Sequence, residues 1–324
     1  MKRIYTTLRI SFLAFLTCIL LNTTAFAQEE ATEDTIIETP VERPVRPAFE
    51  SGLLFDAATT TLYPSKTLEM IIQHRFGVIN FCDDNTDFLG IWGASNIRIG
   101  MNYSILKNLT VGVGATKYNK MEDLQLKYRI IEQTRSNSIP VTVMFYGVAG
   151  IDGSVKSKWD ATSESDSAKY KFSNRLNYFA QIVVSRRFND HLSLQIAPGF
   201  THYNCINKMV VSNNDTSYYD HDRISLSFAG RYKFSPQGSF ILSADYPFKI
   251  QKISEHSEAN SDKVFVAKPN ISVGFEISTS THAFHLYLAN SQGILPQEGL
   301  MWNKNDFFEG QFLIGLNITR LWNF

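Results

Sequence analysis

Apolar and polar residues alternate with a period of two through most of this 324-residue chain. In the segment that starts at Ile97, for example, the apolar residues Ile99 and Met101 are separated by Arg98 and Gly100. On a β-strand this spacing places apolar side chains on one face and polar side chains on the other. The pattern predicts about twelve strands, at residues 68–75, 97–103, 109–115, 124–130, 141–145, 176–184, 192–196, 224–234, 240–246, 271–277, 284–288 and 312–318.

The connections between these strands alternate in length. Short ones lie at 106–108, 133–139, 188–190, 235–238 and 278–280, and longer polar ones at 77–94, 152–173, 204–221, 251–263 and 290–307. Residues 118–122 are a shorter member of the second set. Short turns at one end and long loops at the other are typical of a bacterial outer-membrane barrel, whose closure satisfies the backbone hydrogen bonds in lipid. A soluble β-sandwich would also alternate, but its loops need not sort by length. We therefore expect an all-β fold in which residues 67–324 form one transmembrane antiparallel barrel, with short periplasmic turns and long extracellular loops.

Composition and hydropathy exclude two other classes. The 31 Lys and Arg residues balance the 31 Asp and Glu residues, whereas a nucleic-acid-binding protein is expected to carry a basic excess. Beyond the N-terminus no apolar run approaches the ~20 residues of a membrane-spanning helix. We therefore expect no nucleic-acid partner and no helical-bundle membrane protein.

Residues 1–27 have the three parts of a secretory signal peptide. A positive region with Lys2 and Arg3 precedes an apolar core at 10–21, and residues 25–27 form a small-x-small cleavage site. An uncleaved membrane anchor is the alternative. We expect export through the Sec pathway to the outer membrane of a Gram-negative bacterium, with outer-membrane lipid around the barrel.

The segment between the signal peptide and the first strand has two parts. Residues 28–49 carry six acidic residues, two arginines and three prolines, which predicts a disordered leader. This leader is interpreted either as a solvated linker or as a docking segment for a periplasmic partner. Residues 50–66 include an apolar stretch without a clear period. They are expected either to plug the barrel from below or to contact its periplasmic rim.

Charged residues on the polar faces of the strands are expected to line the lumen and to influence ion preference. The main candidates are Arg75, Arg98, Lys127, Arg129, Arg231 and Glu276, joined by Arg187, Lys233, Glu69, Asp123 and Asp245. Cations exceed acids in this set, which favours anions. The alternative is a filled lumen in which paired charges brace the wall. Gly112 and Gly114 also face inward, where the absence of a side chain should leave space.

The C-terminus resembles the assembly signal of outer-membrane barrels. Phe324 is the last residue and Trp322 lies two residues before it, with apolar residues continuing at that spacing. We expect the barrel-insertion machinery to bind this strand; an ordinary last strand that ends in Phe is the alternative. Trp322 and Phe324, with Tyr103, Phe188 and Tyr232, also suit a periplasmic aromatic girdle.

Residues with reactive or metal-binding chemistry are few. Cys82 and Cys205 both fall in predicted extracellular loops. The sequence leaves open whether they form a disulfide or remain two free thiols. Residues 202–222 contain His, Cys and Asp, but at a spacing that matches no known metal site. His74 and His282 are expected on the outer face without a neighbouring serine nucleophile. We expect no metal, no cofactor and no catalytic residues.

Four stretches resemble a family of outer-membrane β-barrels that is catalogued as a domain of unknown function. They lie at 46–64, 74–77, 96–100 and 123–128, and the resemblance covers most of the chain after residue 27. It implies the barrel and the outer membrane, and it supplies no catalytic residues. We expect a passive channel for small solutes or ions. The alternatives are a closed structural or adaptor barrel that binds a periplasmic partner through its leader, and a lipid-modifying enzyme.

Overall fold

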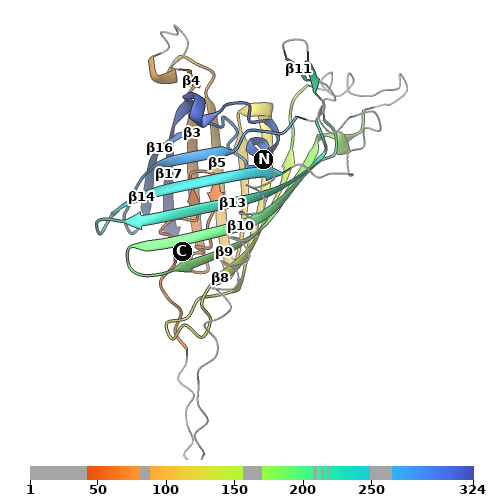
Figure 1. Cartoon of the computed structure of the whole chain (residues 1–324). Coiled ribbons are helices and arrows are strands. Elements are labelled where there is room, and N and C mark those ends of the chain that lie inside the picture. Colours follow the sequence, from red (N-terminus) through yellow and green to blue (C-terminus); the bar gives the residue numbers. More distant parts are fainter. Residues whose placement is uncertain are drawn as a thin grey trace, which may run out of the picture. The chain divides into compact units, whose positions relative to one another are not determined.

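In this computed structural model, the described residues are 42–80, 88–155, 170–206, 210–212, 215–217, 219–248 and 265–324. Within them, twelve strands form a closed antiparallel barrel (Figure 1). They are β3 (Thr67–Arg75), β5 (Asn96–Leu106), β6 (Leu109–Thr116), β7 (Met121–Ile131), β8 (Thr142–Ile151), β9 (Leu176–Arg187), β10 (Leu192–Tyr203), β13 (Asp222–Lys233), β14 (Gly238–Phe248), β15 (Asn270–Ser278), β16 (His282–Ala289) and β17 (Gln311–Asn323). Each pairs with its neighbours in chain order, and the β17–β3 pair closes the barrel.

The twelve predicted strands are confirmed. Each alternating segment falls on one barrel strand to within a residue. Short and long connections alternate as expected except around β7, where the β6–β7 connection at 117–120 is shorter than the β7–β8 connection at 132–141. Most strands extend beyond the predicted segment; β17, for example, has 13 residues. The difference arises because alternation marks only the part of each strand whose outer face is apolar.

Burial along the strands follows the predicted faces. In β5 the side chains of Arg98 and Asn102 are buried, whereas Ile99 and Met101 are exposed. Large apolar side chains are exposed in the same way on the outer faces of the other strands. An apolar surface of this extent requires a covering of lipid.

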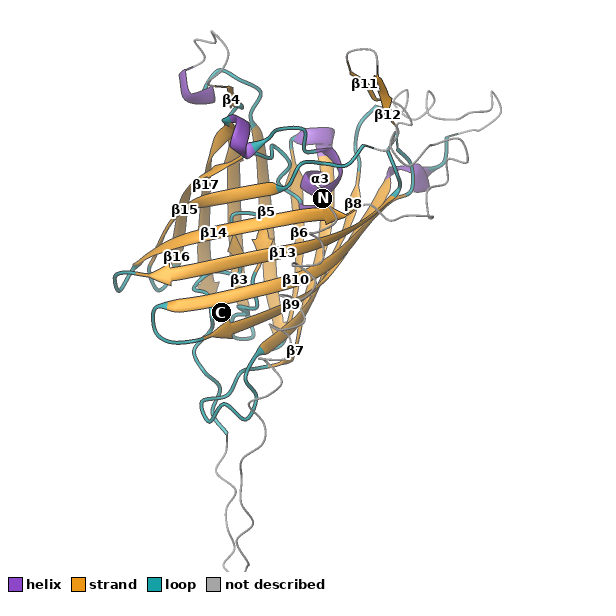
Figure 2. Cartoon of the chain, in the orientation of Figure 1, coloured by secondary structure: helices purple, strands orange, loops and turns teal. Residues whose placement is uncertain are grey.

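The long connections contain short elements that the alternation did not predict (Figure 2). They are β4 (Ile79–Asn80), η1 (Phe88–Gly90), η2 (Tyr118–Lys120), η3 (Phe172–Arg175), β11 (Val210–Ser212), β12 (Asp215–Ser217), α3 (Pro296–Trp302) and η5 (Phe307–Glu309). Elements of up to seven residues are too short for a periodic pattern to identify. Among the residues that the structure describes, no helix has both the length and the apolar character to cross a membrane.

Candidate functional site: the filled barrel lumen

Residues 48–62, here called the internal segment, lie inside the barrel. They include the hairpin formed by β1 (Leu53–Leu54) and β2 (Ala57–Ala58) and are buried along almost their whole length. Backbone carbonyl groups of the segment accept hydrogen bonds from inward-facing side chains on β3, β7 and β10, namely Gln73, Lys127 and Gln195. The sequence left open whether this segment plugs the barrel or contacts its rim. The three side chains that donate to it lie on separate parts of the lumen wall.

The chain enters the lumen at the short-turn end of the barrel. Pro44 forms a β-bridge with Thr134 in the turn between β7 and β8, and the Val45 amide donates to the Gln133 carbonyl at 2.9 Å. This part of the expected disordered leader is therefore placed against the barrel. Burial begins at Ala48, two residues before the predicted pre-barrel segment.

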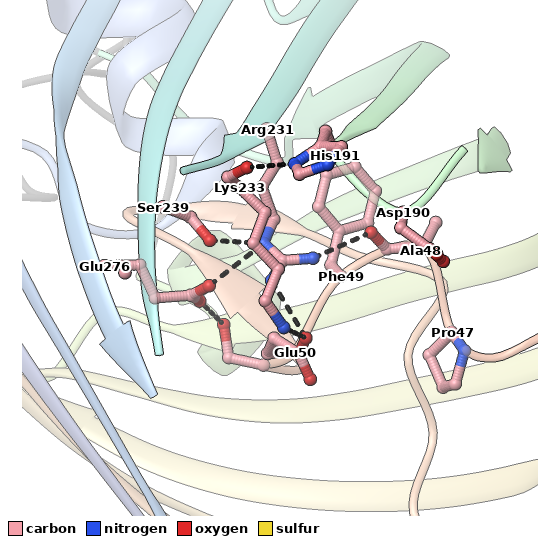
Figure 3. A network of polar contacts seen from close by, with 12 residues as sticks. Pro47, Ala48, Phe49, Glu50, Asp190, His191, Arg231, Lys233, Ser239 and Glu276 are labelled. Carbon is pink, nitrogen blue, oxygen red and sulfur yellow. Dashed lines mark hydrogen bonds and ion pairs between the residues drawn. The ribbon is translucent and has the colours of Figure 1, made fainter. Parts of the chain in front are cut away.

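Glu50 joins the start of the internal segment to β13. Its Oε1 atom accepts from Arg231 at 2.9 Å and from Lys233 at 3.0 Å (Figure 3). Arg231 also lies 3.2 Å from a carboxylate oxygen of Glu276 on β15 and donates to Ser239 on β14. The guanidinium of Arg231 is thus neutralised by carboxylates from the wall and from the internal segment.

Ser51 continues this network toward β16. Its hydroxyl donates to Glu276 Oε2 at 3.0 Å and lies 3.4 Å from His285 Nε2. Glu276 and His285 face each other on paired strands, with Nε2 3.0 Å from the same carboxylate oxygen. Serine and carboxylate therefore meet the same ring nitrogen, whereas a catalytic triad uses both nitrogens of the histidine. The cluster holds the internal segment to the wall.

Asp56 lies in the turn between β1 and β2 and pairs with β3. Its carboxylate lies 3.0 Å from the guanidinium of Arg75, and both side chains are almost fully buried. Asn270 on β15 donates to the same carboxylate at 2.8 Å. Removing one partner of a buried ion pair typically costs about 3–5 kcal/mol. Loss of either partner would therefore destabilise the hairpin in this position, because the remaining charge would stay buried and unpaired.

Phe55 occupies a backbone conformation that a bulky side chain rarely adopts. Its φ is 56°, in the left-handed region, which costs about 1–3 kcal/mol when it is held by its surroundings. The Phe55 ring packs 4.4 Å from the ring of Tyr287, and its carbonyl accepts from Gln73 and Asn317. The wall thus holds the tip of the hairpin through contacts with both the side chain and the backbone of Phe55.

A second buried ion pair lies within the wall itself. Arg98 donates to both carboxylate oxygens of Asp123, at 2.9 and 2.7 Å. Gly114 lies between their strands, and a Cβ there would come within 2.2 Å of the Arg98 guanidinium and 2.6 Å of the carboxylate. Gly114 therefore leaves space, as expected, but the ion pair fills that space. The space beside Gly112 is also filled, because a Cβ there would collide with the side chain of Asn102.

Two other predicted lumen residues differ in their placement. Lys127 is buried, donates to the Gly52 carbonyl at 2.5 Å and lies 5.7 Å from the centre of the Tyr146 ring. Arg129 instead lies at the rim, where it pairs with Glu132 at 2.9 Å and donates to a turn carbonyl. Arg129 keeps the inward parity of Lys127 along β7 but lies at the end of the strand, so its contribution to a lumen lining stays a prediction.

The remaining candidate residues lie away from the internal segment. Phe324 is exposed, and Arg320 lies over the ring of Trp322 at 4.9 Å; recognition of this end by the insertion machinery stays a prediction. Cys82 lies outside the described residues and Cys205 is half buried, so their pairing also stays a prediction. Within the described ranges, no group of three His, Cys, Asp or Glu residues could hold a metal ion.

From the opposite end, α3 folds into the barrel. Its residue Leu300 belongs to the same buried apolar cluster as Ala58 and Leu62 of the internal segment. Glu298 is also fully buried, and its Oε2 accepts from the backbone amides of Ile294 and Leu295 at 3.1 and 3.3 Å. The internal segment and α3 therefore meet inside the lumen. Neither segment has a sequence period that could have indicated this contact.

Small side chains face the lumen on β13, β14 and β15. They are Ser225, Ser227, Ala229, Ser239, Ser243 and Ser272. A barrel of this strand number encloses more space than wall side chains of this size can fill. The internal segment and α3 provide the filling.

Comparison with known proteins places this barrel in a family. No curated protein matches the chain. Among solved structures, the NanC porin shares 9% identity at a TM-score of 0.44, over 78% of this chain and 98% of that one. An outer-membrane channel from Pseudomonas putida F1 shares 12% at 0.41, over 81% and 97%, and OmpF from Salmonella typhi 10% at 0.36, over 79% and 97%. The family described as membrane bound beta barrel domain (DUF5777) matches residues 49–322, and this chain therefore belongs to that family.

Proposed function

We propose that this protein is an outer-membrane channel for small polar solutes or ions, closed at rest by its internal segment. The observation that carries the proposal is the composition of the lumen. A segment of the chain fills it, while the wall behind that segment has small side chains, serine or alanine, at six inward positions on three adjacent strands, among polar and charged residues such as Arg231 and Glu276. Departure of the internal segment would leave a polar passage, whereas a barrel built only as a support has no need of such a wall.

In this proposal, the ion pairs between the internal segment and the wall hold the segment in its closed position. Glu50 and Asp56 belong to the internal segment, and their partners Arg231, Lys233 and Arg75 belong to the wall. In the closed state these cations are paired and exert little selectivity. When the segment leaves, the two carboxylates leave with it, and the lumen gains positive charge.

Planar-bilayer recording of the chain without residues 1–27 tests the proposal, after a heat-dependent gel shift has verified folding. We expect rare openings in the wild type and frequent openings in the Asp56→Asn variant, which loses the buried pair with Arg75. The matched control is Asp190→Asn, which breaks an exposed pair with Arg187 of similar length, 2.8 Å. A folded Asp56→Asn variant that conducts no more often than this control would contradict a channel that these ion pairs hold closed.

A closed adaptor barrel is the second candidate, and one observation favours it. Residues 42–45 run along the turn between β7 and β8, at the end of the barrel where the chain enters the lumen. Under this proposal, removal of residues 28–41 would abolish a co-purifying periplasmic protein and leave the barrel folded. Under the channel proposal the same deletion would leave the conductance of Asp56→Asn unchanged.

A further inference from the structure

A cavity of about 330 Å³ lies at the long-loop end of the barrel. Tyr118 of η2 lines it, as do Tyr219 from the connection before β13 and Ser291, Glu298 and Trp302 from the connection that carries α3. Three long connections that are distant in the sequence therefore contribute to one site. The volume lies at the lower end of the range for small-molecule pockets, about 300–1,000 Å³.

Two buried polar atoms in the lining have no partner in the described chain. They are Oε1 of Glu298 and the hydroxyl oxygen of Ser291, and both residues are only 1% exposed. The other oxygen of Glu298 is fixed by two backbone amides, so the orientation of the carboxyl group is set before any ligand binds. Buried polar atoms are costly without hydrogen bonds, and hydroxyl groups of a ligand would supply them.

Aromatic rings form an apolar part of the same cavity. Tyr219 and Tyr203 both pack edge-on against Trp302, with ring centres 4.7 and 5.4 Å away. These contacts hold the indole in one orientation. A rigid aromatic surface beside hydrogen-bonding groups matches a ligand that has an apolar C–H face and polar edges.

The charge of the lining favours a neutral ligand. Glu298 is accompanied by one cation, Lys304, which is exposed. Burial raises the pKa of Glu298 to about 7, whereas the backbone amides and the charge of Arg75 act in the opposite direction. Near neutral pH this carboxyl group can therefore both donate and accept hydrogen bonds, as hydroxyl groups require.

We propose that this cavity binds a neutral, hydroxyl-rich solute about the size of a monosaccharide. Trp302 and Tyr219 contact its C–H face, and Glu298 and Ser291 bind its hydroxyl groups. The binding itself does not depend on the channel. The identification of such solutes as those that the barrel admits rests on the proposed function.

Isothermal titration of the folded chain without residues 1–27 in detergent tests the site, with D-glucose as the neutral probe. D-Glucuronate and D-glucosamine serve as anionic and cationic probes of the same size. We expect glucose to bind with a millimolar Kd and both charged probes to bind more weakly. Loss of a buried hydrogen-bonding group typically costs about 1–3 kcal/mol, so Glu298→Ala and Ser291→Ala should weaken binding by about tenfold or more.

Two further variants keep the test independent of folding defects. Tyr118 is 46% exposed, so Tyr118→Ala should fold and still weaken glucose binding. Glu132→Ala at the opposite end of the barrel is the control and should bind as the wild type does. A folded wild type that gives no heat with glucose, equal affinity in all variants, or preference for a charged probe would each overturn the proposal. Glucose binding without conductance would instead contradict the channel alone, and conductance without glucose binding would contradict the cavity proposal alone.

Discussion

Arg75 and Asp56 form an ion pair of 3.0 Å between the first barrel strand and the hairpin inside the lumen. The same guanidinium donates to the backbone carbonyl groups of Ser291 and Gly293, in the connection that carries α3. One side chain therefore joins the wall, the internal segment and the connection at the opposite end. The two bodies that fill the lumen are held in part by a single arginine.

We expect Arg75→Lys to open the channel more often while preserving the charge. Lysine offers a compact point charge, and it cannot reproduce the several directed hydrogen bonds of a guanidinium. A loss of about 1.4 kcal/mol in the closed state would raise the open-to-closed ratio about tenfold. Single-channel recording measures this ratio directly.

Arg320→Lys is the matched control for this substitution. Arg320 lies on the outer face of β17 over the Trp322 ring, away from the internal segment. Its replacement should leave the opening frequency unchanged. Equal behaviour of the two lysine variants would mean that Arg75 does not hold the channel closed.

Gly114→Ala should destabilise the barrel without opening it. The added Cβ would collide with both Arg98 and Asp123 and separate a buried pair, at a cost of about 3–5 kcal/mol. A lower urea midpoint for the loss of the heat-modifiable form would measure the effect. In the control Gly230→Ala, the new Cβ meets a flexible leucine methyl group at 3.2 Å, so the midpoint should hardly change. Similar midpoints for both variants would argue against a structural role of the Arg98–Asp123 pair.

The wall of this barrel could be predicted from the sequence, whereas most of its filling could not. Alternation reports which face of a strand a residue occupies, and it placed Arg98 and Arg231 in the lumen correctly. It does not report the partner of a residue. Ser51 and Glu276 are 225 residues apart, and only the insertion of the internal segment into the barrel brings them together.

The alternation pattern did not predict the positions of the internal segment and α3, for a different reason. Residues in the lumen are surrounded by wall on all sides, so no polar face alternates with an apolar one. The apolar character of residues 51–59 suggested burial, but it left a plug and a rim contact equally open. His285 could have been found as an inward-facing residue, because the alternation of β16 placed it on the inner face, whereas its pairing with Glu276 follows only from the register of the structure.

The charge left behind on opening predicts anion preference in the conducting state. In the double variant Glu50→Gln, Asp56→Asn the wall cations Arg75 and Lys233 lose their partners from the internal segment. Reversal potentials under a salt gradient should therefore show anion selectivity, which should weaken at high salt through screening. Adding Lys233→Glu should shift the reversal potential toward cations. Selectivity that does not respond to Lys233→Glu would place this residue outside the ion pathway.

Glu298 predicts a pH dependence of stability. Burial raises the pKa of this carboxyl group from its usual 4.5 to about 7. Between these values the folded protein binds more protons than the unfolded chain, so stability falls as the pH rises. The difference corresponds to a destabilisation of about 3 kcal/mol, which is absent below the unfolded pKa and fully present above the folded one. Glu298→Gln should remove this contribution, because its amide oxygen can still accept from Ile294 and Leu295.

The comparison between wild type and variant isolates Glu298 from the other carboxylates that titrate in this range. We expect Glu298→Gln to be close to the wild type in urea midpoint at about pH 5 and more stable at about pH 8. Glu132→Gln, which alters a partly exposed rim carboxylate, should follow the wild type at both values. A constant difference between Glu298→Gln and the wild type across this range would mean that the carboxyl group keeps an ordinary pKa.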